Sequence, residues 1–272
     1  MVQSTDIILF WWALIGFGAS SLTHIVFLVI NKKIAGTIAQ LLMAGSFAVL
    51  SAAITVRALR IGHLPVTNMF EYLSIFAWSA GLFYFVFVYF FRQHLVGAFI
   101  APVVFMLIVA ASLLPKEPNM QLVPALQSYW LQIHVTLAAL GEAAFGVAFA
   151  ANIMFFMKKI FSPRVFGGRL PSYDRLDMVS HKSIIIGYPV FTVGALFAGA
   201  VWAEQAWGTF WSWDPKEVCS LIVWLIYTIY FHLRFLRGWR GSRSALLSIL
   251  GFIAAVLTFF SNMFLGGLHA YT

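Results

Sequence analysis

The chain has few charged residues and almost no cysteine. Only 10% of its 272 residues are Asp, Glu, Lys or Arg, whereas 62% are hydrophobic. A soluble domain carries roughly 25% charged residues, so this balance excludes an ordinary soluble fold. The single cysteine, Cys219, excludes a disulfide within the chain, a CxxC metal or redox motif and a CxxCH haem-attachment motif. We therefore expect an integral membrane protein.

Alternating apolar and polar segments of about ten residues, typical of membrane barrels, are also lacking. Long apolar runs are present instead, and about 20 such residues cross a bilayer as an α-helix. We predict an all-α fold: a polytopic helical bundle of about eight transmembrane helices, forming one membrane domain over residues 1–272. The predicted spans are Ile7–Ile30, Thr37–Val56, Met69–Phe91, Val96–Leu114, Tyr129–Met157, Ile184–Ala203, Val218–Phe235 and Ala245–Leu265.

The positive charges of the predicted loops indicate an orientation. Of the 17 lysines and arginines, 13 fall in one set of loops and 4 in the other. Because cytoplasmic loops carry the excess of Lys and Arg, the first set is expected inside. An even number of spans then places both termini outside, together with residues 202–217. This accounts for the net charge of +8 without a nucleic-acid partner.

Two further expectations concern organisation. No cleavable signal is expected, because the first apolar segment is long and lysines follow it, as in a retained span. The loop at 158–183 is predicted to be the longest cytoplasmic loop. It is expected to divide an N-terminal part of five helices from a C-terminal part of three.

The most unusual segment, residues 202–217, reads WAEQAWGTFWSWDPKE. Four of the ten tryptophans lie in it: Trp202, Trp207, Trp211 and Trp213. Tryptophans that only anchor a protein at the membrane interface are spread over many helix ends, so this clustering favours a binding site over an interfacial belt. An aromatic surface of this kind suits a large, planar, partly charged ligand.

Two histidines are predicted at the depth of this loop. His134 lies at the outer mouth of the fifth span, and His269 lies just beyond the eighth. Two neutral imidazoles on opposite sides of an aromatic platform can ligate a haem iron axially. The alternative for each is an interfacial histidine bonded to water or lipid headgroups. The outer cations available for porphyrin propionates are Lys216, Arg57 and Arg60.

His24, Glu142 and His232 lie within predicted spans, where a charge is costly and a function is the default hypothesis. His232 lies roughly 15 residues after Glu217, about 22 Å deeper at 1.5 Å per residue. A haem bound there would occupy a second site near the cytoplasmic face; a core hydrogen bond is the alternative, and for His24 that alternative is favoured. Glu142 shares a helix face with His134, and we expect it to be either protonated in the interior or lining a polar cavity.

Two helix-capping patterns occur on the outer side. Asn68 followed by Glu71 is expected to cap the third span, and Asp214 followed by Pro215 is expected to cap the seventh. For Asp214, capping a helix and shaping the aromatic platform are compatible roles.

Residues 207–217, WGTFWSWDPKE, resemble the WWD signature of haem-handling proteins in cytochrome c maturation. The Asp-Pro-Lys-Glu ending is similar to the CcsA/ResC branch of the system II cytochrome c synthase, whereas the related CcmC usually lacks it and CcmF is far longer. Further motifs that match in order are GHLP and NMFE within 62–71, WLQIHV at 130–135, YFHLR at 230–234 and GLH at 267–269. The resemblance covers about residues 60–272.

The resemblance implies roles for particular residues. His134 and His269 match two external axial ligands of the haem iron. His232 matches a transmembrane ligand of an inner haem, whose second ligand belongs to a CcsB/ResB partner. The four tryptophans of the loop and Asp214 are expected to bind haem b. Glu142 departs from the uncharged residue expected in the family.

The resemblance implies a membrane subunit of a cytochrome c synthase, or haem lyase, complex in a bacterial inner membrane or a thylakoid membrane. It would move haem outward and present it for thioether attachment to the CxxCH motif of apocytochrome c. Two other interpretations are open. One is a CcmC-type chaperone that delivers haem without taking part in attachment, and the other is a transporter of another amphipathic ligand with the tryptophans as a gate.

Overall fold

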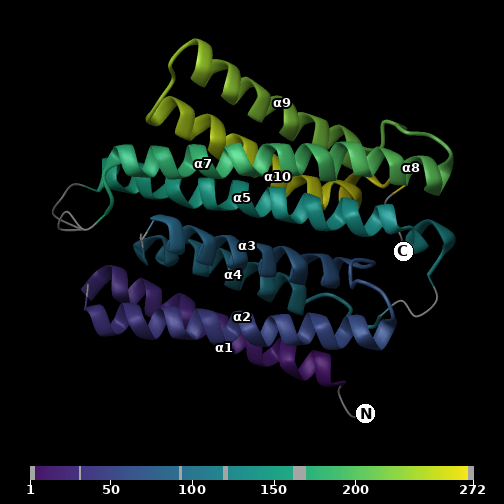
Figure 1. The fold of residues 1–272 in the computed structure, drawn as a ribbon, viewed down its shortest axis with the longest axis horizontal. Coiled ribbons are helices and arrows are strands. Elements are labelled where there is room, and N and C mark those ends of the chain that lie inside the picture. The colour runs from purple at the N-terminus through teal and green to yellow at the C-terminus, as the bar shows by residue number, and fades with distance from the viewer. Residues whose placement is uncertain (1–3, 31, 92–93, 119–121, 162–169, 269–272) are drawn as a thin grey trace. The chain divides into compact units, whose positions relative to one another are not determined.

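A computed structural model describes the chain except for residues 1–3, 31, 92–93, 119–121, 162–169 and 269–272 (Figure 1). The described residues form helices and turns without strands, as the composition predicts. The α-helices are α1 (Thr5–Ile30), α2 (Lys33–Ile61), α3 (Met69–Phe91), α4 (Gly97–Ser112), α5 (Tyr129–Ile160), α7 (Tyr173–Phe191), α8 (Gly199–Trp207), α9 (Pro215–Leu236) and α10 (Ser242–Leu265). The short helices η1 (His94–Val96) and η2 (Pro124–Gln127) are 3₁₀, and η3 (Thr192–Ala198) is a π-helix.

Within the described residues, seven helical segments are long and apolar enough to cross a membrane, so the chain is a multi-pass membrane protein. One of them, Tyr173–Trp207, comprises α7, η3 and α8. The eighth predicted span falls in α10, where the described apolar stretch, Ser242–Thr258, is shorter than the other seven.

The predicted loop at 158–183 is wrong at both ends. Helix α5 continues to Ile160, and α7 already begins at Tyr173. Ser172 caps α7 by accepting the backbone N–H of Arg175 at 3.3 Å, and Asp174 suits the positive end of the helix dipole. Because of this cap, α7 begins before its apolar residues do. Hydropathy detects only the apolar residues, so it places the start of the helix too late.

The chain divides into two compact units, described separately. Unit 1 comprises residues 1–121 and 157–171, and unit 2 comprises residues 122–156 and 172–272. In unit 1, α1 packs along α2 and α4, and α3 packs along α4. In unit 2, α9 packs against α10 and α7 (Figure 1). The predicted division into five and three helices is wrong, because most of α5 belongs with the C-terminal helices. That all 272 residues form one membrane domain stays a prediction.

Glycines explain why α5 packs in unit 2. A Cβ added at Gly141 of α5 would lie 2.7 Å from Cβ of Phe191, and one added at Gly187 of α7 would lie 2.9 Å from Cβ of Ala144. Small residues of this kind let transmembrane helices approach closely. One turn after Gly141, the ring of Phe145 stacks on Tyr227 of α9 with centroids 3.8 Å apart.

Candidate functional site

His134, near the N-terminus of α5, has its ring fixed by its neighbours. Its Nδ1 lies 2.9 Å from the carbonyl oxygen of Gly194. Its ring stacks on Trp202, with centroids 5.8 Å apart and 8° between the planes. Because a carbonyl oxygen only accepts, Nδ1 carries the proton of the neutral ring. The lone pair is then on Nε2, which is the arrangement usual in metal-ligating histidines.

Two glycines make this position of His134 possible. The Gly194 carbonyl also accepts the N–H of Gly199, the i→i+5 bond of the π-helix η3. A Cβ at Gly194 would collide with Leu137 and lie 2.7 Å from the backbone nitrogen of Ala138. A Cβ at Gly199 would lie 2.9 Å from Nδ1 of His134. The close approach of η3 and α8 to α5 therefore determines where the imidazole lies.

Trp202 and Trp207 support the histidine from within unit 2. Trp202 is 1% exposed, and its Nε1 donates to the carbonyl of Ala125 at 2.7 Å. Trp207 meets Trp202 edge-on, with centroids 4.9 Å apart. Since Trp202 is buried and stacked on His134, it holds the ring and does not add to the exposed aromatic surface.

The other two tryptophans lie in the loop between α8 and α9. Gly208 ends α8 with φ of 79°, and Trp213 also has a positive φ, of 61°. This conformation is uncommon for a large residue, and surrounding contacts must hold it. Trp213 is 71% exposed, and Trp211 meets it edge-on at 5.8 Å. The loop thus presents an exposed aromatic surface, as its composition predicts.

Asp214 is the N-cap of α9, as predicted, and it makes a second connection. Its Oδ1 accepts the N–H of Lys216 at 2.9 Å, and it forms a capping box with Glu217. Glu217 also accepts the N–H of Ser212 at 2.8 Å, which closes the loop onto the helix. The other oxygen of Asp214, Oδ2, accepts the N–H of Leu268 at 2.6 Å.

The predicted ligand His269 lies outside the described residues. The chain that leads to it is described as far as Leu268. Gly266 and Gly267 have φ of 68° and 119°, and a Cβ at Gly267 would meet Oδ2 of Asp214. The tryptophan loop and the segment before His269 are therefore in direct contact within unit 2.

His232 lies on an exposed face of α9. Ile222, Leu225, Ile229 and Leu236 are exposed as well, and with His232 they follow a spacing of three and four residues. Such residues share one helix face. The alternative of a histidine buried in the core is therefore wrong.

A polar cluster that the sequence did not reveal joins α7, α9 and the turn before α10. Asp177 accepts from Arg234 through both carboxylate oxygens, at 3.0 and 2.6 Å, and from the N–H of Gly241 at 3.0 Å. His181, on the next turn of α7, has Nδ1 3.3 Å from the hydroxyl of Tyr230. The partners are more than 40 residues apart in the chain, and no local motif links them.

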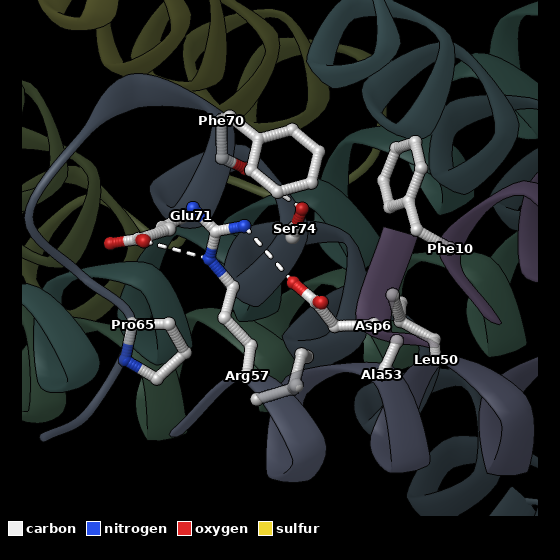
Figure 2. A pocket seen from close by; sticks show the side chains of 10 residues that line it. Asp6, Phe10, Leu50, Ala53, Arg57, Pro65, Phe70, Glu71 and Ser74 are labelled. Atoms are coloured by element: carbon white, nitrogen blue, oxygen red, sulfur yellow. Dashed lines mark hydrogen bonds and ion pairs between the residues drawn. The ribbon is translucent and has the colours of Figure 1, made fainter. Parts of the chain in front are cut away.

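Two of the three predicted propionate cations are paired with carboxylates in unit 1. Figure 2 shows Arg57 between Asp6 and Glu71, at 3.2 and 2.8 Å. Arg60 lies 2.9 Å from the second oxygen of Asp6. Arg57 is only 3% exposed and borders a cavity of about 20 Å³, so it is not an available surface cation. Lys216, in unit 2, lies in the first turn of α9 and is partly exposed.

The structure also places three other polar residues that the sequence singles out. His24 is buried and bonds to the carbonyl of Ser20 at 2.9 Å and the hydroxyl of Tyr84 at 3.1 Å, which confirms a core histidine. Asn68 accepts the N–H of Glu71 at 2.9 Å, which confirms the cap of α3. Glu142 is buried in α5, on the inward face that its spacing predicted.

Comparison with known proteins places this arrangement in a family. Residues 66–269 match the family described as Cytochrome C assembly protein. A protein of Chlamydomonas reinhardtii named Cytochrome c biogenesis protein CcsA is 34% identical over 93% of this chain and 73% of its own length. A protein with the same name from Synechococcus is 32% identical over 84% of this chain and 83% of its own length.

A solved structure shares the fold. The protein named Cytochrome c Heme Lyase CcmF aligns with 96% of this chain at a TM-score of 0.72 and 18% identity. This chain spans 48% of that longer chain.

Proposed function

This chain belongs to the cytochrome c assembly protein family, and we propose that it is the haem-presenting membrane subunit of a system II cytochrome c synthase. Its family gives it a role in cytochrome c maturation and a connection with haem. The proposed function is more specific than this family role. The outer end of unit 2 holds haem b, as substrate, while apocytochrome c is attached to the haem.

The observation that carries this proposal is the state of His134. Hydrogen bonding of Nδ1 to Gly194 leaves the lone pair on Nε2, and stacking on Trp202 restricts rotation of the ring. A ligand nitrogen prepared in this way loses little conformational freedom when it binds iron. The exposed indole of Trp213 supplies apolar surface for a porphyrin. We propose His269 as the second axial ligand, in line with the family motif.

In the attachment step this chain contributes by holding the haem in position. Each cysteine thiol of the CxxCH motif adds across a haem vinyl group, so that a sulfur–carbon bond forms and the thiol hydrogen ends on the other vinyl carbon. The thiols are those of the apocytochrome. The haem iron remains held by histidine until the histidine of the CxxCH motif replaces one ligand.

We propose a second haem ligand at His232, facing a partner subunit. A histidine in the middle of an exposed apolar helix face is costly against lipid, so such a face is better covered by protein. The 3–4 spacing of Ile222, Leu225, Ile229, His232 and Leu236 suits contact with one transmembrane helix. A CcsB/ResB-type protein is the partner that this proposal names, and it would supply the other axial ligand.

The orientation belongs to the same proposal. The excess of Lys and Arg in one set of loops puts the tryptophan loop on the periplasmic or lumenal side of an inner or thylakoid membrane. Haem would then enter near His232 and leave near His134.

The test uses the chain purified with its partner from haem-replete cells. We expect bis-histidine haem spectra, and loss of the outer haem in His134→Ala and in His269→Ala. His63→Ala is the matched control, because it removes a histidine of unit 1 to which the proposal assigns no role. Spectra of both ligand variants that matched the parent would overturn the proposal. Full haem binding without attachment to an added apocytochrome c would favour the delivery chaperone instead.

A further inference from the structure

We propose that Asp214 is a positioning residue that fixes the C-terminal segment leading to His269, and through it the strength of the outer haem ligation. This inference rests on the proposed function. It assigns Asp214 a role through the protein backbone in place of contact with the porphyrin.

The two oxygens of the Asp214 carboxylate bond to different parts of the chain. Oδ1 caps α9 at the N–H of Lys216, 2.9 Å away, and Oδ2 accepts the N–H of Leu268 at 2.6 Å. Asp214 is 4% exposed, so the carboxylate that accepts both bonds is largely shielded from water. Hydrogen bonds to a charged acceptor are stronger than neutral ones, and Leu268 directly precedes the proposed ligand.

The sequence around Leu268 is adapted to this contact. A Cβ at Gly267 would meet Oδ2 of Asp214 and would lie 2.9 Å from Cδ of Pro215. Gly267 also has φ of 119°, which residues with a Cβ rarely adopt. Only glycine therefore allows the carboxylate to reach the next N–H.

The two proposed outer ligands are held by different kinds of structure. His134 belongs to a helix and is backed by the buried ring of Trp202. The segment before His269 has left α10, and residues 265–268 are exposed. The hydrogen bond from Leu268 to Asp214 thus holds the less firmly packed of the two ligand-bearing segments. When this bond is lost, we expect His269 to dissociate from the iron before His134 does.

Four variants separate this role from capping of α9. Asp214→Ser retains a good N-cap, but its single oxygen cannot also reach Leu268. Asp214→Ala loses both bonds. Gly267→Ala leaves Asp214 intact and blocks the approach. Gly266→Ala is the matched control, since Gly266 has φ of 68°, in the same left-handed region, but its Cβ would meet no atom within 4 Å.

The measurement is the rate at which carbon monoxide binds the ferrous haem of the complex, because a bis-histidine iron must first release a ligand. We expect Asp214→Ser and Gly267→Ala to accelerate binding about tenfold or more, from loss of a hydrogen bond to a charged group. Combining the two should add little, since both remove one contact. Gly266→Ala should stay within about threefold of the parent, because its strain does not break that bond.

The outcomes distinguish this inference from the proposed function. A parent complex without bis-histidine haem would overturn both. A normal parent spectrum with unchanged rates in Asp214→Ser and Gly267→Ala would overturn the positioning role alone. A defect confined to Asp214→Ala, together with a lower melting temperature, would reduce Asp214 to a helix cap and overturn it as well.

Discussion

Replacing Gly199 by alanine should displace His134 with little effect on folding. Gly199 has φ of −61° and ψ of −45°, so alanine is compatible with its helical backbone. The added Cβ would lie 2.9 Å from Nδ1 and 3.0 Å from Cε1 of His134. The ring cannot move away freely, because Nδ1 bonds to Gly194 and the face of the ring stacks on Trp202.

The expected magnitudes follow from opposing terms. Alanine is favoured over glycine in a helix by about 1 kcal/mol, while overpacking costs about 1–3 kcal/mol. The net loss of stability is therefore at most about 2 kcal/mol, or roughly 4–8 °C in melting temperature for a chain of this size. Carbon and nitrogen atoms prefer about 3.5 Å or more, so the ring must shift by about half an ångström. A displaced ring cannot ligate the iron in the geometry that its hydrogen bond and stacking set, so we expect haem affinity to fall about tenfold or more, which corresponds to about 1.4 kcal/mol.

The assay is haem titration of the purified complex, with thermal melting measured in parallel. Gly146→Ala is the control within the same unit, since its Cβ would lie 3.3 Å from the ring of Phe252, away from the histidine. We expect that variant to bind haem normally. A folded Gly199→Ala protein with parental haem affinity would refute the view that close packing of α8 fixes His134.

Three further predictions concern other parts of the chain. Trp213→Gly should leave the melting temperature unchanged or higher, because glycine accepts φ of 61°, yet lower cytochrome c assembly; unchanged assembly in cells would contradict a role for the exposed indole. Arg57→Met should cost about 3–5 kcal/mol, because it takes the cation away from the buried Glu71 carboxylate and leaves Asp6 with Arg60 alone, whereas Arg60→Ala, at a partly exposed pair, should cost about 1 kcal/mol or less; equal denaturant midpoints would argue against the buried pair. His232→Ala should remove one haem per complex, measured as pyridine haemochrome, because it removes a ligand of the proposed inner site; unaltered haem content would contradict the inner site.

The sequence predicts the spans, the helix caps and the aromatic loop well, because each depends on residues that are close together in the chain. Apolar runs of about 20 residues mark the spans, because the bilayer demands them. The caps at Asn68 and Asp214 depend on residues within three positions, so short patterns reveal them. The aromatic character of the loop around Trp213 likewise follows from its composition.

Contacts between distant residues explain what the sequence did not predict. His134 bonds to Gly194, which lies 60 residues away in the chain. Asp177 bonds to Arg234, 57 residues away, and Asp214 bonds to Leu268, 54 residues away. Arg57 was expected at the surface because it lies in an outer loop region, but Asp6, 51 residues earlier, neutralises it in the interior of unit 1. Charge counting predicts an orientation in the membrane and does not reveal such pairs.

We propose above that His134 and His269 together hold a haem iron at the outer end of unit 2. The most direct measurement is the absorption spectrum, oxidised and reduced, of the complex purified with its partner, for the parent and for the variant with both histidines replaced by alanine. We expect a bis-histidine spectrum in the parent, loss of the outer haem signal in the double variant and loss of cytochrome c assembly. A double variant that retained the parental spectrum and assembled cytochrome c would contradict it.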